Sequence, residues 1–370
     1  MSKIYVAIIG AGGVGKSFIS QLNAYVGRIR NKHTINTILI SRSSKALQSK
    51  DYSGINLTTW ESDLSGGGGG KPPAFPEETL KFLTGAPGPV ILVDNTSSEE
   101  VAGEYPRFLS AGVHVVTPNK KGFSGSLELF QAIYAASAGQ NGNGGYVFHE
   151  ATVGAGLPVL STLRDLQDTG DEIVKIEGVF SGTMSYLFNS FAPLSPTGSE
   201  KPFSACVAQA RELGYTEPDP RDDLNGLDVA RKLTILARLS GLPVSQLTSF
   251  PIQSLIPKPL ETAASAEEFL DGLAEFDNDM EGVKAAAEKE GAVVRYVGSL
   301  DVAKGEVSVG LRNFDKGSAV AGLKGSDNII SFYTRRYGDR ALIVQGAGAG
   351  AEVTAMGVLS DFIKVLERLK

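Results

Sequence analysis

The chain has 370 residues, of which 42% are hydrophobic and 21% are charged, a composition typical of a folded globular protein. The formal net charge is −6 and the basic residues are scattered, which argues against nucleic acid or an anionic membrane as the partner and favours a small-molecule substrate. The single cysteine, Cys206, excludes an intrachain disulfide and suits a reducing compartment.

The chain begins Met1-Ser2-Lys3 and runs directly into an apolar strand pattern, without the basic and apolar regions of a secretory signal. No stretch approaches the roughly 20 apolar residues of a membrane span. We therefore expect a cytoplasmic protein with no membrane partner. A chain of this length is expected to form two domains.

The first 150 residues alternate between strand and helix patterns. Short apolar runs rich in β-branched residues, typical of strands buried in a parallel sheet, occupy residues 4–9, 35–40, 89–94, 114–117 and 146–149. Helical spacing occupies residues 14–26, 99–111 and 126–136. The alternation predicts an α/β domain with a Rossmann-like, doubly wound parallel sheet. Two glycine-rich segments, residues 65–73 and 139–145, predict surface loops.

The character of the sequence changes after residue 150. Helical patterns occupy residues 157–166, 203–213, 223–239 and 264–290. Strand patterns occupy residues 173–180, 293–300, 306–312, 328–337 and 341–344. This mixture predicts a second, α+β domain that binds the substrate. A last helix is predicted over residues 351–370.

The first strand and the first helix are joined by a G-x-G-x-x-G loop, Gly10-Ala11-Gly12-Gly13-Val14-Gly15. Gly10 permits the tight turn, Gly12 lets the backbone approach a pyrophosphate, and Gly15 lets helix and strand pack closely. The helix N-terminus, from Gly13 and Val14 onward, offers free N–H donors to phosphates. The loop therefore predicts a dinucleotide site, and a tight turn without a ligand is the alternative.

The second strand ends in Ser41-Arg42-Ser43-Ser44, without the Asp or Glu that would bind the ribose 2′-hydroxyl of NAD. Arg42 and the hydroxyls can instead hold a 2′-phosphate. NADP(H) is therefore the favoured cofactor and NAD(H) the alternative. The other interpretation of Arg42 is a solvated loop cation.

Carboxylates crowd one segment of the second domain, at Glu217, Asp219, Asp222, Asp223 and Asp228. Such crowding is repulsive unless a cation lies among them, and an amino-acid substrate carries an ammonium group. Asp223 is predicted to cap the helix that follows. On that helix, Asp228 and Lys232 are four residues apart and share a face, an arrangement that can orient a lysine for proton transfer. An exposed, helix-stabilising ion pair is the alternative.

Taken together, these motifs resemble those of homoserine dehydrogenases, most closely the short fungal enzymes. The resemblance extends over nearly the whole chain, through the glycine loop and the segments 93–98, 117–121, 149–158, 178–183, 215–232 and 345–350. It implies an NAD(P)-dependent interconversion of L-homoserine and L-aspartate 4-semialdehyde, in the biosynthesis of threonine and methionine. It also implies that neither a kinase domain before the chain nor a regulatory domain after it is present.

The resemblance assigns roles in the substrate site that spacing alone does not. It implies that Lys232 is the acid/base acting on the homoserine hydroxyl, or on the aldehyde oxygen in reverse, with Asp228 as its partner. Glu217 and Asp223 correspond to substrate-site carboxylates, with Glu217 expected near the amino group. Thr183 corresponds to a further substrate contact.

The same resemblance implies roles beside the cofactor and for a bound ion. Lys120 corresponds to a lysine between cofactor and substrate, and Asn95 and Thr96 follow a strand whose end faces the nicotinamide half of the dinucleotide. Backbone carbonyls of one loop, helped by a carboxylate, correspond to a sodium site formed by Glu150, Val153, Ala155 and Leu157. From the residues alone, a hinge between domains without an ion is the favoured interpretation of this loop.

The resemblance also bears on domain organisation and assembly. The last helix is expected to return to the first domain, so that residues 1–150 are completed by about 341–370, and residues 151–340 form the substrate-binding and dimerisation domain. A homodimer through the sheet of this second domain is implied. Gly348, just before the last helix, is expected either to approach the nucleotide with its backbone or to allow a close contact between a helix and a strand.

Two other functions are compatible with a dinucleotide fold. A phosphorylating semialdehyde dehydrogenase needs a cysteine nucleophile, whereas Cys206 lies in an apolar helical context typical of a core. A non-catalytic dinucleotide sensor has no use for the carboxylate and lysine cluster of residues 217–232. Both are therefore disfavoured.

Overall fold

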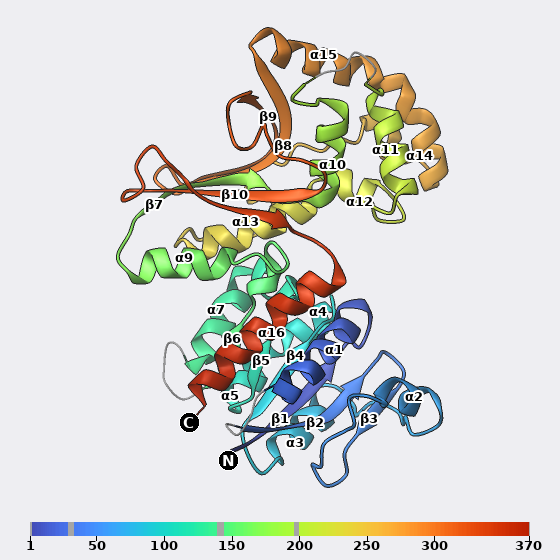
Figure 1. Ribbon diagram of the computed structural model, residues 1–370, viewed down its shortest axis with the longest axis vertical. Coiled ribbons are helices and arrows are strands. Elements are labelled where there is room, and N and C mark those ends of the chain that lie inside the picture. The colour runs from blue at the N-terminus through green and yellow to red at the C-terminus, as the bar shows by residue number, and fades with distance from the viewer. Residues whose placement is uncertain (1, 29–32, 139–143, 196–199, 370) are drawn as a thin grey trace. The chain divides into compact units, whose positions relative to one another are not determined.

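The computed structural model describes residues 2–28, 33–138, 144–195 and 200–369. The chain divides into two compact units (Figure 1). Unit 1 comprises Met1–Gly156 and Ala349–Lys370, and unit 2 comprises Leu157–Gly348. Within the described residues, no helix has both the length and the apolar character that crossing a membrane requires. Most of the loop predicted at 139–145 lies outside the described residues.

Unit 1 is built on a six-stranded sheet with the order β3-β2-β1-β4-β5-β6. Its strands are β1 (Ser2–Ile9), β2 (His33–Ser41), β3 (Ala46–Gln48), β4 (Val90–Asp94), β5 (His114–Val116) and β6 (Val147–Phe148). All neighbouring pairs are parallel except the short edge strand β3, which runs antiparallel to β2. The predicted doubly wound, Rossmann-like sheet is confirmed.

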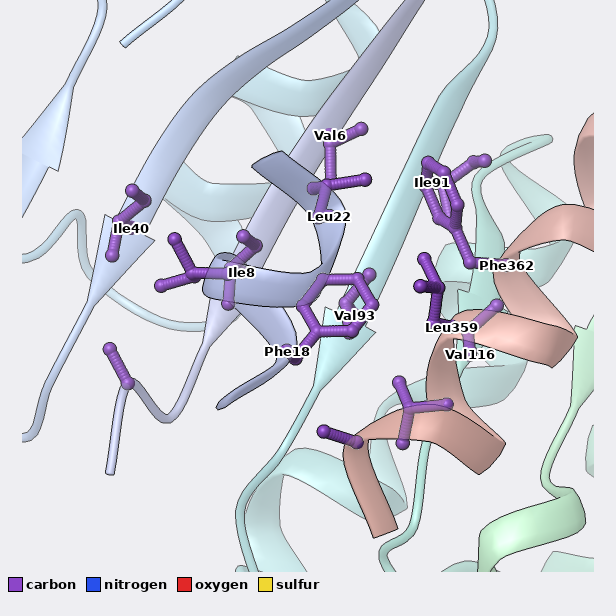
Figure 2. Close-up of a cluster of buried hydrophobic side chains, with 14 of the residues drawn as sticks. Val6, Ile8, Phe18, Leu22, Ile40, Ile91, Val93, Val116, Leu359 and Phe362 are labelled. Atoms are coloured by element: carbon purple, nitrogen blue, oxygen red, sulfur yellow. The ribbon is translucent and has the colours of Figure 1, made fainter. Parts of the chain in front are cut away.

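Helices cover both faces of this sheet. They are α1 (Gly13–Arg28), α2 (Trp60–Ser65), α3 (Glu77–Thr84), α4 (Glu99–Gly103), α5 (Tyr105–Ser110), α6 (Lys121–Ser124), α7 (Leu127–Ala136) and α16 (Ala351–Arg368). On one face, Phe18 of α1 and Phe362 of α16 pack against β-strand residues such as Val93 (Figure 2). Burial of these apolar side chains explains why the last helix returns to unit 1.

The strand order reverses between β1 and β4, because the chain moves from β1 to β2 on one side and returns to β4 on the other. In doubly wound sheets, ligands bind outside the carboxyl ends of the strands at such a switch point. The loops after β1 and β4 therefore define the edge at which a functional site is expected.

Unit 2 contains an antiparallel sheet with the order β11-β10-β7-β8-β9. Its strands are β7 (Ile173–Val179), β8 (Ala292–Asp301), β9 (Glu306–Asp315), β10 (Asp327–Thr334) and β11 (Leu342–Ala347). Its longer helices are α9 (Val159–Asp168), α10 (Gly182–Phe191), α11 (Phe203–Glu212), α13 (Leu227–Leu239), α14 (Ala266–Leu273) and α15 (Asp277–Lys289). Helix α13 packs on β8, where a Cβ on Gly298 would lie 2.8 Å from Leu233.

Three details differ from the sequence-based expectations. The helix predicted over residues 223–239 is broken into α12 (Arg221–Leu224) and α13, because Gly226 adopts a left-handed conformation with φ +75°. Asp223 therefore lies within α12 and does not cap the long helix, so its predicted capping role is wrong. Strand β11 pairs with β10 in unit 2, so of the segment 341–370 only the last helix belongs to unit 1. Helices α2, α3 and α10 were not expected.

One buried group makes the stability of unit 1 depend on pH. His114 of β5 is buried, and its Nδ1 accepts a hydrogen bond from the backbone N–H of Tyr146 at 2.9 Å. Burial lowers the pKa of His114 from 6.5 to about 4. The folded state therefore holds the neutral imidazole, while the unfolded chain takes up a proton below its ordinary pKa.

We expect His114 to lower the free energy of unfolding by up to about 3 kcal/mol as the pH drops from about 6.5 towards 4, whereas Asp361, whose pKa burial raises to about 6, acts in the opposite direction. In His114→Gln this contribution is absent, so the fall over that range should be shallower than in the parent protein. Denaturant unfolding at a series of pH values measures both slopes. Equal slopes would show that His114 does not carry the effect.

Candidate functional site

The glycine loop joins β1 to α1 as the sequence predicts, and two of its glycines are required by space. Gly10 has φ +86°, and an added Cβ would lie 2.7 Å from Cγ2 of Thr96. A Cβ on Gly15 would lie 2.2 Å from the carbonyl oxygen of Gly10. A Cβ on Gly12 would meet no atom within 4 Å, so the space there is open to a ligand. The structural roles predicted for Gly10 and Gly15 are therefore confirmed.

The loop is tied to the end of β2 and opens a long helix. The N–H groups of Gly10 and Ala11 donate to the carbonyl of Ser41 at 3.0 and 2.9 Å. Helix α1 begins at Gly13, with Val14 in its first turn, and runs for 16 residues. Its N-terminal N–H groups and dipole favour an anion at this end of the helix.

Arg42 follows β2 and lies against the glycine loop. Its Nε donates to the carbonyl of Ala11 at 3.0 Å, and its Nη2 pairs with Glu61 at 2.9 Å. The guanidinium carbon lies 5.6 Å from the ring centroid of Trp60. Arg42 is thus anchored beside the loop and is not a freely solvated cation.

A buried carboxylate organises the other side of the switch point. Asp94, at the end of β4, accepts hydrogen bonds from the Tyr105 hydroxyl at 2.5 Å and from Nδ2 of Asn119 at 3.1 Å. Its second oxygen accepts the backbone N–H of Thr96 at 2.8 Å. Burial, followed by the charge of Asp94, raises the pKa of Tyr105 well above its usual value. This network fixes the loop that carries Thr96 and the turn that carries Lys120.

Asn95 presents an unsatisfied amide beneath the glycine loop. Its Nδ2 and Oδ1 atoms are buried and have no hydrogen-bond partner in the described part of the chain. The Nδ2 atom lies 3.7 Å from where a Cβ on Gly15 would be. Buried polar groups are rarely left unpaired, because desolvation without a partner is costly. The open space at Gly12, the cation at Arg42 and the Asn95 amide together fit a dinucleotide.

Lys232 of α13 is the buried basic residue of the candidate site in unit 2. It is buried, and its Nζ lies 2.8 Å from Oδ2 of Asp228. The same Nζ donates to the carbonyl oxygen of Phe180 at 2.5 Å. The expected Asp228–Lys232 pair is therefore formed, but its lysine is buried, unlike that of an exposed helix pair. Phe180 directly follows the strand β7 and lies two residues before α10 begins at Gly182.

A second cluster lies at the start of α10. The Thr183 hydroxyl lies 2.9 Å from Oδ1 of Asp223 and 2.6 Å from the carbonyl of Tyr215. The other carboxylate oxygen of Asp223 accepts the backbone N–H of Glu217 at 2.8 Å. Burial raises the pKa of Asp223, and the charges of Glu217 and Asp228 raise it further. Thr183, Glu217 and Asp223 are thus brought together, with Asp228 close enough to act on them electrostatically.

The carboxylates of this segment differ in whether a basic residue compensates them. Asp219 is held by Arg221, with Nη2 to Oδ2 at 2.6 Å, which lowers the pKa of Asp219. Asp228 is held by Lys232. Glu217 and Asp223 form no ion pair with a basic side chain among the described residues. This leaves uncompensated negative charge at Glu217 and Asp223.

The predicted cation loop begins in the 3-10 turn η1 (Glu150–Thr152) and packs on α16. The backbone N–H of Glu150 donates to Asp361 at 2.6 Å, and Lys364 lies 3.4 Å from the Glu150 carboxylate. Ala155 has φ +54°, a conformation that costs energy for a residue with a Cβ. Within the described residues, no cluster of three or more His, Cys, Asp or Glu side chains could hold a metal.

For the remaining predicted site residues, the structure gives their position in the fold and few contacts. Val153 lies in the same loop of unit 1, and Leu157 is the first residue of unit 2. Gly348 lies in unit 2, where an added Cβ would lie 2.0 Å from Nδ2 of Asn328. That contact is sufficient to require a glycine at 348. Cys206 is buried in α11, and burial raises its pKa to about 11.

Several groups that contact the predicted sites were missed by sequence reasoning. Tyr105 and Asn119 reach Asp94 from different elements, and Asp361 reaches Glu150 across more than 200 residues of sequence. An acidic residue on the apolar face of the last helix was the available signal for Asp361. Nothing in the sequence indicated that the carbonyl of Phe180 would contact Lys232.

Comparisons with known proteins agree over the whole chain. A family model for the NAD-binding domain of homoserine dehydrogenase matches residues 10–147, and a homoserine dehydrogenase model matches residues 158–363. The chain is 57% identical to the homoserine dehydrogenase of Emericella nidulans over 374 aligned residues, covering 99% of each. It is 48% identical to that of Saccharomyces cerevisiae, again covering 99% of each.

Solved structures show the same fold. A Candida auris protein of unknown function superimposes with a TM-score of 0.93 at 46% identity, covering 100% of this chain and 99% of the other. A hyperthermophilic archaeal homoserine dehydrogenase in complex with NADPH gives a TM-score of 0.73 at 24% identity, covering 100% and 99%. At that identity the second likeness concerns the fold alone.

The glycine loop provides a matched pair of substitutions. Gly12→Ala should fold with unchanged thermal stability, because its Cβ has free space, yet should weaken dinucleotide binding roughly tenfold or more by filling that space. Gly15→Ala should lower the melting temperature as well, because its Cβ collides with the backbone of Gly10. Calorimetry of binding and thermal unfolding measure both effects. Unchanged binding in a folded Gly12→Ala protein would place the ligand elsewhere.

Proposed function

The chain belongs to the homoserine dehydrogenase family of NAD(P)-dependent oxidoreductases, and on this premise we propose that it interconverts L-homoserine and L-aspartate 4-semialdehyde with Lys232 as the acid/base. The observation that carries the proposal is the buried Lys232 ammonium, held between Asp228 and the carbonyl of Phe180. A buried, hydrogen-bonded lysine is a fixed proton donor and acceptor.

The proton transfer follows from these contacts. Towards the aldehyde substrate, the Lys232 ammonium donates a proton to the carbonyl oxygen as that oxygen becomes a hydroxyl. In the opposite direction, the neutral lysine accepts the proton of the homoserine hydroxyl. The nicotinamide cofactor, when bound, supplies or accepts the hydride at the adjacent carbon. Asp228 and Phe180 hold Nζ in place throughout.

The charge distribution supports an amino-acid substrate. Glu217 and Asp223 lack basic partners among the described residues, and their mutual repulsion contributes to the raised pKa of Asp223. A substrate ammonium placed beside them would compensate this charge. We assign Glu217 to the substrate's ammonium group, with Asp223 and Thr183 as further residues of the substrate site.

For the cofactor we propose NADP(H), with NAD(H) as the alternative, bound by the glycine loop with Arg42 at the 2′-phosphate. The residues assigned to the dinucleotide are Gly10, Gly12, Gly13, Val14, Gly15, Arg42, Asn95, Thr96, Lys120 and Gly348. We assign Lys120 a position between cofactor and substrate. The support is the open space at Gly12 and the anchored cation at Arg42.

We also propose a sodium ion on the carbonyls of Val153, Ala155 and Leu157, with help from Glu150. Oxygen donors suit a hard cation, and the left-handed Ala155 is the strain that such a loop would carry.

We propose a homodimer through the sheet of unit 2, where the side chain of Ile343 in β11 is 42% exposed. A cytoplasmic role in threonine and methionine biosynthesis completes the proposal.

The acid/base assignment predicts the effect of Lys232→Ala. We expect kcat for homoserine oxidation to fall at least about a hundredfold, because general acid–base catalysis contributes that much or more. Cofactor binding and folding should persist. Arg231→Ala, which removes a neighbouring positive charge on the same helix, should retain turnover and serves as the matched control. Near-normal turnover in folded Lys232→Ala would refute the assignment.

A thiol mechanism, as in phosphorylating semialdehyde dehydrogenases, predicts the opposite behaviour for Cys206. Since this thiol is buried with a pKa of about 11, it should resist a thiol reagent at pH 8 until the protein unfolds. Cys206→Ser should retain turnover. Rapid modification of the folded protein with loss of activity would restore the thiol mechanism.

A further inference from the structure

A carboxylate from another segment reaches the end of β2, where the sequence itself has no acidic residue. Glu61, in the first turn of α2, places Oε1 at 2.5 Å from Nζ of Lys16 and at 2.9 Å from Nη2 of Arg42. Lys16 comes from the first turn of α1, and Arg42 follows β2. Three elements therefore converge on one anion between two cations, beside the glycine loop.

The position of this cluster corresponds to one part of the dinucleotide. In doubly wound folds, the residue at the end of the second strand faces the 2′ position of the adenosine ribose. Arg42 holds that place, and its Nε bond to the carbonyl of Ala11 ties it to the glycine loop. Glu61, bound to Arg42, therefore lies beside the place where the 2′ position of a bound dinucleotide is expected.

Resting on the proposed dehydrogenase function, we propose that Glu61 sets the selectivity between NAD(H) and NADP(H). Its carboxylate accepts the ribose 2′-hydroxyl of NAD(H), the task that an acidic residue at the end of the second strand performs in other dinucleotide folds. The 2′-phosphate of NADP(H) displaces this carboxylate and takes its place between Lys16 and Arg42. Glu61 thus favours the binding of NAD(H) and competes with the 2′-phosphate of NADP(H).

The electrostatics allow this exchange. Hydrogen bonds from Lys16 and then from Arg42 lower the pKa of Glu61, so it is a full anion at neutral pH. The three side chains are 49% (Glu61), 48% (Lys16) and 36% (Arg42) exposed. Ion pairs this exposed are weak and readily exchanged. A phosphate brings more negative charge than a carboxylate and can accept from the guanidinium of Arg42 in a bidentate manner.

The chain carries its own reporter of this position. Trp60, the only tryptophan in the sequence, precedes Glu61 and lies 5.6 Å from Arg42. Its fluorescence should respond to a dinucleotide at the glycine loop. Affinity can therefore be measured without substrate or turnover, and calorimetry provides a second readout that a change beside Trp60 does not affect.

The test compares Glu61→Gln with Glu128→Gln, an exposed glutamate of α7 whose substitution makes the same change of charge within unit 1. We expect Glu61→Gln to bind NADPH more tightly and NADH more weakly, each by roughly fivefold to tenfold, the net effect of one ordinary hydrogen bond at an exposed position. Glu128→Gln should leave both dissociation constants unchanged. Arg42→Ala should weaken the binding of NADPH more than the binding of NADH.

The outcomes separate this inference from the proposed reaction. If Glu61→Gln, with an unchanged melting temperature, shifts both affinities in the same direction or neither of them, Glu61 is only a surface ion-pair partner and the inference is wrong. If the affinities shift oppositely while the parent protein fails to oxidise homoserine, the inference holds and the proposed reaction falls. If the parent protein binds neither dinucleotide, both are overturned.

Discussion

The burial of the Lys232 ammonium is the constraint on which the arrangement of the candidate site in unit 2 depends. A charged group removed from water must be compensated, and here Asp228 and the carbonyl of Phe180 do so. The register of α13 places these groups, because the helix begins directly after Gly226. A Cβ on Gly226 would lie 2.0 Å from the hydroxyl of Tyr296, so only glycine fits this start. Tyr296 is itself held by the carbonyl of Gln253 at 2.6 Å.

The same reasoning about charge separates residues that hold the site from residues that are free to bind. Asp94 and Asp361 are buried carboxylates whose oxygens are occupied by neighbouring donors, so each fixes loops and offers little to a ligand. Asn95 and Glu217 have unmet capacity: the first has an unpaired amide, and the second has no basic partner among the described residues. Binding capacity is therefore distributed over both units, each on its own rigid elements.

The sequence was most informative where a local pattern determines structure. The alternating strands and helices predicted the doubly wound sheet of unit 1, and the spacing of Asp228 and Lys232 predicted their pairing. It was least informative where distant segments meet. The end of β2 carries no acidic residue, yet α2 brings Glu61 to that position, a contact that depends on how the chain between β3 and β4 folds. The break at Gly226 was also missed, because an apolar helical period continued across it.

In the proposed reaction Lys232 transfers a proton and does not merely stabilise the fold. Chemical rescue tests this most directly: the turnover of Lys232→Ala with homoserine is measured while small primary amines are added. If Lys232 transfers the proton, activity rises with the concentration of free amine, because the amine enters the space left by the side chain and accepts the proton in its place. A folded, cofactor-binding Lys232→Ala protein whose residual activity does not respond to any amine small enough to enter would contradict it.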